Sequence, residues 1–284
     1  MTATLLDFSG RSDLGLHAEI VGDIAGAAEP LGIASLIVGA FARDLHLLYG
    51  HSIETSRRTE DLDFAMAVPD WSAFEALQQR LIATARFSPS PTAEHRLRHR
   101  NGLPIDLVPF GRVETRERKI AWPPRGEVVL NVFGFREAQA SACDVVFPGN
   151  VRARVASLPA LALLKIVCWN DRHYASPRKD AHDLLLIVKN YLLAGNEGRL
   201  LDQFVEWTQE NSFDYELAGA RLLGHDVRAL LDDQGIERVG RLLSEQADPR
   251  TPAQLPAEMA PGDPDRARAL LDAMLRGLMD SWRP

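Results

Sequence analysis

The chain has 284 residues, 46% hydrophobic and 25% charged, which is enough to bury the core of one large domain or two modest ones. Its formal net charge of −7 gives no overall basic field, so any nucleic-acid partner would need a local basic patch. Two cysteines, Cys143 and Cys168, exclude a disulfide framework and a thiolate zinc site, and both are expected to be reduced and buried.

The sequence shows no sign of a membrane or secreted protein. No apolar run approaches the roughly 18–20 residues that a membrane span needs. The N-terminus also lacks the basic start and apolar stretch of a signal peptide. We therefore expect a cytoplasmic protein.

Helices and strands alternate in the first half of the predicted structure. Apolar spacing separates helices from strands, and turn residues such as Asn101-Gly102 mark hairpins. In chain order, the predicted elements are a helix over 13–31, a strand over 34–38, a helix over 40–49, a basic loop over 50–59, a strand over 61–68, a helix over 71–85, and strands near 96–99, 103–108, 128–130 and 145–147.

The second half has the spacing of helices only. We predict helices over 158–169, 179–193, 200–210, 213–223, 226–243 and 265–282, with a loose linker over 249–264 because that stretch holds five prolines. The fold class is therefore α+β. Its first domain, 1–155, is a mixed sheet flanked by helices, and its second, 156–284, is a helical domain that completes the cleft.

Asp61 and Asp63 are the first candidates for chemistry. Residues two apart on a strand point to the same face, so the two carboxylates would stand side by side. Such a pair favours a divalent cation with oxygen ligands, Mg²⁺ above all. Alternatively, the two aspartates cap the preceding loop or face solvent.

Asp106 lies in an otherwise apolar strand, where a solvated charge is unexpected. It must be paired, hydrogen-bonded or bound to a metal. Three carboxylates on adjacent strands suit two metal ions, one activating the attacking oxygen and one holding a triphosphate. The alternative is an ion pair with an arginine such as Arg98.

A glycine turn follows the strand over 34–38. Gly39 would let backbone amides approach a phosphate at the start of the next helix, and Arg43 lies one turn further along. Alternatively, this is a plain strand-to-helix turn, with Arg43 paired to Asp44 or Glu60.

Together these segments resemble a known family. The glycine turn, Arg58-Thr59-Glu60-Asp61-Leu62-Asp63 and Ile105-Asp106-Leu107-Val108 are similar to the polymerase-beta-type nucleotidyltransferase superfamily, and more narrowly to the AbiEii/AbiGii toxin family. A helix carrying Lys165, followed by Lys179-Asp180-Ala181-His182-Asp183-Leu184, extends the resemblance. The matched motifs span roughly 36–187.

The resemblance implies a role for each matched residue. Asp61 and Asp63 would bind two Mg²⁺ ions (or Mn²⁺), and Asp106 would bind the catalytic one and help to deprotonate the acceptor hydroxyl. The residues expected at the nucleotide are Gly39, Ala40, Arg43, Thr59, Lys165 and Lys179. Asp180 would hold Lys165 in place or contact the base, and Asp183 would be structural.

Some of these residues have a simpler interpretation. In this interpretation Lys165 extends its amine to water, and Lys179-Asp180 is an exposed, charged start of a helix. His173 and His182 are expected to be ordinary polar positions, because this chemistry needs no histidine.

The sequence also departs from the family pattern. The superfamily usually carries serine after the turn glycine, but here Ala40 takes that position, so one hydroxyl contact to phosphate is lost. The basic loop with Arg57 and Arg58 is longer than usual. It either touches the substrate or is a solvated surface turn.

Three functions follow from these patterns. The first is an NTP-dependent nucleotidyltransferase, the toxin of a toxin–antitoxin system with a cognate antitoxin, whose acceptor is the 3′ end of tRNA. Phosphate contacts to the RNA would come from Arg96, Arg98, Arg100, Arg57 and Arg58. The second is an antibiotic-modifying nucleotidyltransferase with a small-molecule acceptor. The third is a non-catalytic nucleotide-binding module, which Ala40 favours and the three aspartates oppose.

Overall fold

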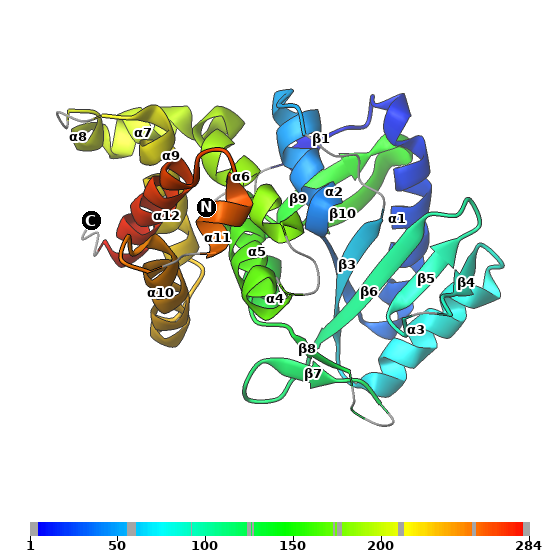
Figure 1. Cartoon of the computed structure of the whole chain (residues 1–284). Helices are drawn as coiled ribbons and strands as arrows, with labels where there is room; N and C mark the ends of the chain where they lie inside the picture. Colours follow the sequence, from blue (N-terminus) through cyan, green and yellow to red (C-terminus); the bar gives the residue numbers. More distant parts are fainter. Residues whose placement is uncertain are drawn as a thin grey trace. The chain divides into compact units, whose positions relative to one another are not determined.

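The computed structural model describes residues 5–55, 61–91, 93–123, 126, 128–172, 174, 178–209, 213–251 and 254–280 (Figure 1). The chain forms two compact units. Unit 1 consists of residues 1–45 and 56–157, and unit 2 of residues 46–55 and 158–284. The short segment 46–55 thus belongs with the helical half, although it lies inside the first half of the sequence.

Unit 1 is built on one mixed eight-stranded sheet with the strand order β1-β9-β10-β2-β3-β6-β5-β4. Its strands are β1 (Leu5–Asp7), β2 (Ala34–Val38), β3 (Leu62–Val68), β4 (Phe87–Pro89), β5 (Arg96–His99), β6 (Pro104–Gly111), β9 (Cys143–Phe147) and β10 (Val151–Val155). A separate hairpin pairs β7 (Lys119–Ala121) with β8 (Val129–Asn131).

Strand β3 lies near the middle of the sheet and explains its mixed character. It pairs antiparallel with β2 and parallel with β6. One face of β3 carries only buried apolar side chains, those of Leu62, Phe64, Met66 and Val68, and the other face begins with Asp63. The predicted class, a mixed sheet flanked by helices and followed by helices, is confirmed.

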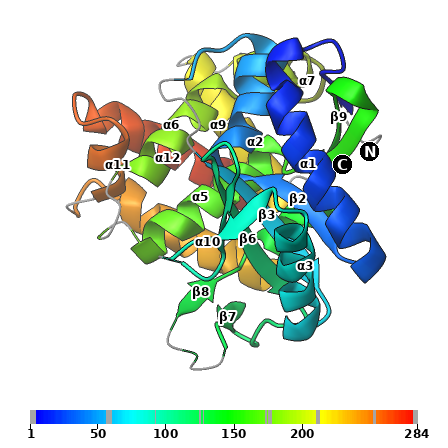
Figure 2. The same ribbon diagram turned by 90° about the vertical axis from the view of Figure 1, so that its right-hand side faces the viewer.

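Helices of unit 1 supply the apolar surfaces that bury this sheet. They are α1 (Gly15–Ala28), α2 (Gly39–Asp44), α3 (Trp71–Ala83) and α4 (Phe135–Ala140), with short helical turns at Ser12–Leu14, Glu29–Leu31 and Pro148–Asn150. Helices α1 and α3 contact each other (Figures 1 and 2). Helix α1 also contacts β2, and α3 also contacts β3. The ring of Trp122 packs edge-on against Trp71 and Phe74 of α3, so this tryptophan is a packing residue as expected.

Unit 1 differs from the sequence prediction in several details, among them helix α4 (Phe135–Ala140), which was not predicted. The helix expected over 40–49 is α-helical only as far as Asp44 and continues as the wider π-helical turn η3 (Leu45–Gly50). The short edge strands β1 and β4 were not predicted. Three residues are too few to show a period, and pairing with β9 and β5 creates these strands.

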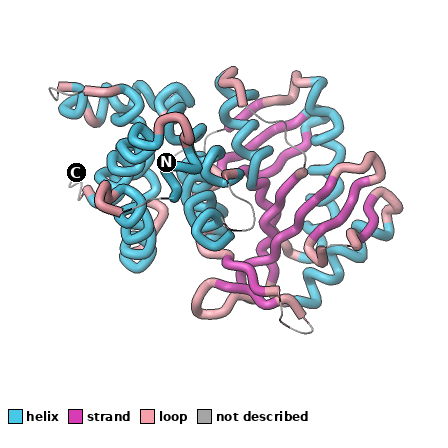
Figure 3. Tube along the Cα trace, in the orientation of Figure 1, coloured by secondary structure: helices cyan, strands magenta, loops and turns pink. Residues whose placement is uncertain are grey.

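Among its described residues, unit 2 contains helices and connecting loops but no strands (Figure 3). Its helices are α5 (Leu158–Arg172), α6 (Lys179–Asn190), η5 (Leu192–Asn196), α7 (Glu197–Gln203), α8 (Val205–Thr208), α9 (Tyr215–Arg228), α10 (Asp233–Ala247), α11 (Gln254–Met259) and α12 (Pro264–Met279).

Helices α9 and α12 form the closest helix pair of unit 2, and glycines make this possible. A Cβ on Gly224 would lie 1.9 Å from the carbonyl oxygen of Met274. A Cβ on Gly277 would lie 1.8 Å from the carbonyl oxygen of Arg221. Because backbone atoms cannot move aside as a flexible side chain can, only glycine fits at these two positions.

Three predictions in unit 2 were wrong in detail. The expected loose linker contains α11, whose Leu255 and Met259 are buried, so packing outweighs its proline content. The helix expected to start at Asp226 starts after Asp232, whose side chain caps α10 at Gly235. Asp226 instead lies inside α9 and pairs with Arg199. The helix expected over 200–210 is divided at Phe204 into α7 and α8.

Cysteines and membrane spans complete the comparison with the sequence. Cys143 and Cys168 are free thiols, as expected, but both are half-buried rather than buried. Within the described residues, none of the helices is both long and apolar enough to cross a membrane.

We predict that Gly277→Ala lowers the free energy of unfolding by about 1–3 kcal/mol, because its methyl group overlaps the backbone of α9. Gly198→Ala is the matched control, since Gly198 lies in α7 with nothing within 4 Å of its added Cβ. Urea unfolding would measure both variants. Equal stability of the two would contradict the close packing of α9 and α12.

Candidate active site

The sheet brings the predicted aspartates together through its strand register. Asp63 lies opposite Asp106 in the parallel pair β3–β6 and opposite Val38 in the antiparallel pair β2–β3. Asp61 precedes β3 by one residue, so it is two residues from Asp63. All three carboxylates therefore meet at one end of β3 and β6.

These carboxylates are close enough to share a cation. One carboxylate oxygen from each of Asp61, Asp63 and Asp106 lies within 4.8 Å of the others. Asp106 is buried, whereas Asp61 and Asp63 are half-buried. Anionic oxygens are the ligands that Mg²⁺ and Mn²⁺ prefer, so the donor set fits the predicted metal.

An arginine already contacts this cluster. Arg96 faces Asp106 across the antiparallel pair β5–β6 and donates two hydrogen bonds to it, Nε to Oδ1 at 2.6 Å and Nη2 to Oδ2 at 2.7 Å. Its Nη2 also lies 3.8 Å from Oδ2 of Asp61. The bond to Asp106 raises the pKa of Arg96. The ion pair foreseen for Asp106 thus exists, but with Arg96 and not Arg98, which donates to the Gly102 carbonyl.

Gly39 is required by its contact with Asp63. Its φ of +71° is in the left-handed region, and a Cβ there would lie 2.0 Å from Oδ2 of Asp63. The glycine turn therefore seats the carboxylate directly against the backbone at the start of α2. The role predicted for Gly39, close approach of the backbone to phosphate, stays a prediction.

The other residues predicted near the nucleotide lie in different surroundings. Arg43 is only 3% exposed and its guanidinium donates to Asp44 Oδ1, at 2.9 Å from Nε and 2.6 Å from Nη2. This is the pairing that the simpler interpretation of the glycine turn foresaw. Ala40 is half-buried in the first turn of α2. Thr59, together with Arg57 and Arg58, lies outside the described residues.

Unit 2 carries the second group of predicted residues. Lys165 of α5 is 6% exposed, and its Nζ lies 3.0 Å from Asp180 Oδ1 and 2.5 Å from Asp183 Oδ2. The prediction that Asp180 holds Lys165 fits this geometry, and the alternative in which Lys165 extends to water is wrong. Asp180 itself is 2% exposed, so it is not part of an exposed helix start.

Charge compensation decides the protonation of this buried group. Burial alone would lower the pKa of Lys165, but Asp183 and Asp180 outweigh burial and raise it. Burial alone would raise the pKa of Asp180, but Lys165 and Arg172 outweigh it and lower that pKa. Lys165 and Asp180 are therefore both charged.

Arg172 is the residue that the sequence prediction missed here. Its Nε donates to Asp180 Oδ2 at 2.9 Å and its Nη2 to Asp180 Oδ1 at 3.1 Å. The available signal was its position seven residues, or two helical turns, after Lys165 on the same face of α5. Lys179 is half-buried, His182 is exposed, and His173 lies outside the described residues.

A further acidic group occurs in unit 1. Ligand atoms of Glu19, Asp23 and His99 also lie within 4.8 Å of one another. Arginines pair with both carboxylates, Arg86 with Asp23 at 2.5 Å and Arg100 with Glu19 at 2.8 Å. These pairs already balance the two negative charges.

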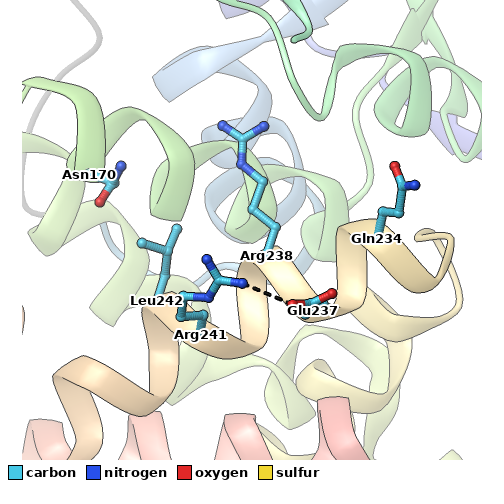
Figure 4. A pocket seen from close by; sticks show the side chains of 6 residues that line it. All are labelled: Asn170, Gln234, Glu237, Arg238, Arg241 and Leu242. Carbon is cyan, nitrogen blue, oxygen red and sulfur yellow. Dashed lines mark hydrogen bonds and ion pairs between the residues drawn. The ribbon is translucent and has the colours of Figure 1, made fainter. Parts of the chain in front are cut away.

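Two surface hollows among the described residues lie away from the aspartates. One of about 500 Å³ is found at the other end of β3 and β6, where Val68 and Gly111 line it. Another of about 220 Å³ lies in unit 2 between α5 and α10 (Figure 4), where Arg241 is paired with Glu237. Neither hollow includes a predicted site residue, so the assignment of the site depends on the carboxylate geometry.

Comparison with known proteins identifies a family match. The family described as "Nucleotidyl transferase AbiEii toxin, Type IV TA system" matches residues 28–282. No curated protein matches the sequence.

Two solved structures of one protein are also similar. The crystal structure of ANT(2″)-Ia in complex with adenylyl-2″-tobramycin has 15% identity and a TM-score of 0.38, and the match covers 65% of this chain and 98% of that one. The solution structure of ANT(2″)-Ia has 11% identity and a TM-score of 0.37, with 69% and 99% covered. Structural similarity at this identity and TM-score supports no functional conclusion, so that conclusion depends on the family match.

Gly39→Ala should destabilise unit 1 more than Gly32→Ala does. Both glycines have a positive φ, +71° and +65°, so both substitutions bear the roughly 1–2 kcal/mol cost of a left-handed residue. Only at Gly39 does the new methyl group meet a carboxylate, which adds about 1–3 kcal/mol. Urea unfolding of the two variants measures the difference, and equal losses would show that Asp63 moves aside at no cost.

Lys165→Met should lower the free energy of unfolding by about 3–5 kcal/mol, because it leaves the buried Asp180 and Asp183 without their shared cation. Lys189→Met is the control, since Lys189 is 42% exposed and its loss should change stability by no more than about 0.5 kcal/mol. Chemical denaturation reports both values. A Lys165→Met variant as stable as the control would refute the compensated ion group.

Proposed function

We propose, since the chain belongs to the AbiEii nucleotidyltransferase toxin family, that it is the toxin of a type IV toxin–antitoxin system and transfers a nucleoside monophosphate from an NTP to an acceptor hydroxyl. The single observation that carries the chemistry is the cluster of Asp61, Asp63 and Asp106 at one end of β3 and β6. The proposed cofactor is Mg²⁺, two ions, with Mn²⁺ as a substitute.

The proposed metal ligands fit a divalent cation. Three anionic oxygens converge within 4.8 Å, and the absence of a side chain at Gly39 leaves room for the Asp63 carboxylate. When bound, divalent cations would neutralise these carboxylates, hold the triphosphate and favour ionisation of the acceptor hydroxyl. Asp106, the most buried of the three, is proposed to orient that hydroxyl and to accept its proton.

Nucleotide transfer of this kind depends on positioning and electrostatics rather than on a covalent intermediate. The chain contributes the strand register that aligns Asp63 with Asp106, and the Gly39 turn that fixes the Asp63 side chain. The roles expected of Lys165, Lys179 and Asp180 at the nucleotide remain predictions.

The proposed acceptor is the 3′-terminal hydroxyl of tRNA, because its blockage would stop translation and so account for toxicity. A type IV system also implies a cognate antitoxin, which we propose as the partner. RNA binding by an acidic chain would depend on local arginines, so it should weaken steeply as salt rises.

Transfer of labelled nucleotide tests this proposal. The purified protein is incubated with Mg²⁺, each α-labelled NTP in turn, and either total tRNA or an aminoglycoside. We expect label on tRNA from the wild type and at least a hundredfold less, in order of magnitude, from Asp63→Asn. Asp144→Asn is the matched control, because Asp144 lies in β9 with 54% of its side chain exposed and should leave transfer unchanged.

Each arm of this assay has a distinct meaning. Label on the aminoglycoside alone would replace tRNA with a small-molecule acceptor. Transfer that survives Asp63→Asn would refute the metal assignment. Expression in bacteria adds the toxin test, in which the wild type should arrest growth and Asp63→Asn should not.

A further inference from the structure

Arg96 occupies a position that the nucleotide-transfer reaction does not by itself explain. It stands in the same cross-strand row as Asp63 and Asp106, on the next strand outward, β5. Its guanidinium binds both oxygens of Asp106, at 2.6 and 2.7 Å, and lies 3.8 Å from Asp61. A single positive charge is thus shared by two of the three proposed metal ligands.

The guanidinium and a divalent cation would use the same acceptors. Asp106 has two carboxylate oxygens, and Arg96 donates to both of them. A cation bound by Asp106 would share an oxygen to which Arg96 already donates, and its positive charge would repel the guanidinium. The side chain of Arg96 is 31% exposed, so it has access to solvent into which it can withdraw.

We propose that Arg96 is the internal counter-ion of the metal site. It holds Asp106 in place and neutralises it while the divalent cation is absent, and it gives up this carboxylate when the cation binds. Arg96 is a positioning residue in this proposal, because it acts through Asp106. The inference rests on the proposed function, which supplies the metal site.

Two consequences follow from this competition. Without metal, Arg96 stabilises the fold, because three carboxylates this close repel one another and one of them is buried. With metal, the divalent cation repels the guanidinium at the same carboxylate, so Arg96 weakens metal binding. By thermodynamic linkage, the stabilisation by Arg96 without metal and the weaker metal binding in its presence measure the same coupling free energy, that between the guanidinium and the cation.

Arg98 provides a matched control. It lies two residues along β5, on the same face as Arg96, but stands opposite Pro104 rather than Asp106. Its Nη1 donates to the Gly102 carbonyl at 3.0 Å. Removing Arg98 therefore takes the same charge from the same strand without changing any contact that Arg96 makes with the aspartates.

The experiment measures binding of Mn²⁺ alone to the full chain, without nucleotide. Free Mn²⁺ is counted by its electron paramagnetic resonance signal, and thermal melts are recorded with and without Mn²⁺. The variants are Arg96→Met, Arg96→Lys, Arg98→Met and Asp63→Asn.

Arg96→Met should bind Mn²⁺ about fivefold or more tightly than the wild type, whereas Arg98→Met should match the wild type. Without metal, Arg96→Met should melt about 2–4 °C or more below the wild type, and saturating Mn²⁺ should close most of that gap. Arg96→Lys keeps the charge but loses the paired hydrogen bonds, so its affinity should fall between the other two. This variant provides the affinity test if Arg96→Met does not fold.

Three outcomes would overturn the inference. An Arg96→Met or Arg96→Lys affinity equal to or weaker than that of the wild type would show no competition. A loss of melting temperature that is the same with and without Mn²⁺ would make Arg96 merely structural. If the wild type binds no Mn²⁺, or if Asp63→Asn binds it as tightly as the wild type, the aspartate cluster is not the metal site. The proposed function and the inference would then fail together. In the first two cases the metal site stands and only the role of Arg96 fails.

Discussion

Repulsion between carboxylates on neighbouring strands is the constraint on which this site depends. Asp63 and Asp106 are directly opposite each other in the β3–β6 register, and Asp61 is two residues away. The hydrogen bonds of the sheet hold the backbones of β3 and β6 together, so a nearby cation lowers the repulsion between these carboxylates. Arg96 is one such cation in the structure described, and we propose that a divalent ion takes over this role in the reaction.

The two units handle buried charge in different ways. In unit 2, Lys165, Asp180 and Asp183 are 6%, 2% and 6% exposed, and Lys165 pairs with both carboxylates while Arg172 also pairs with Asp180. Such a closed group fixes how α5 and α6 pack. In unit 1, Asp61 and Asp63 remain half-buried. That cluster is accessible to cations from solvent, which suits a binding site, whereas the closed group suits a structural or positioning role.

Much of the fold could be read from the chain itself, because local periodicity is a local property. The strands over 34–38 and 61–68 and the hairpin at Asn101-Gly102 occur where their patterns predict them. The errors occur where contacts distant in sequence decide. Proline content suggested a linker over 249–264, yet burial of Leu255 and Met259 forms a helix there. Asp226 has the residue type of a helix cap, yet its partner is Arg199.

The amino-acid sequence alone indicated the residues that we propose to carry the chemistry: two aspartates on one strand face, a third in an apolar strand, and a glycine before a helix. Tertiary structure alone decided their partners. Arg96 rather than Arg98 faces Asp106 because the β5–β6 register places it there, and a shift of two residues would exchange them. Register depends on hydrogen bonding between strands and on the packing of a whole sheet. The spacing of residues along one strand does not specify the hydrogen bonding between strands or the packing of the sheet. The partners that balance the charges of the site can therefore be identified only in the folded chain.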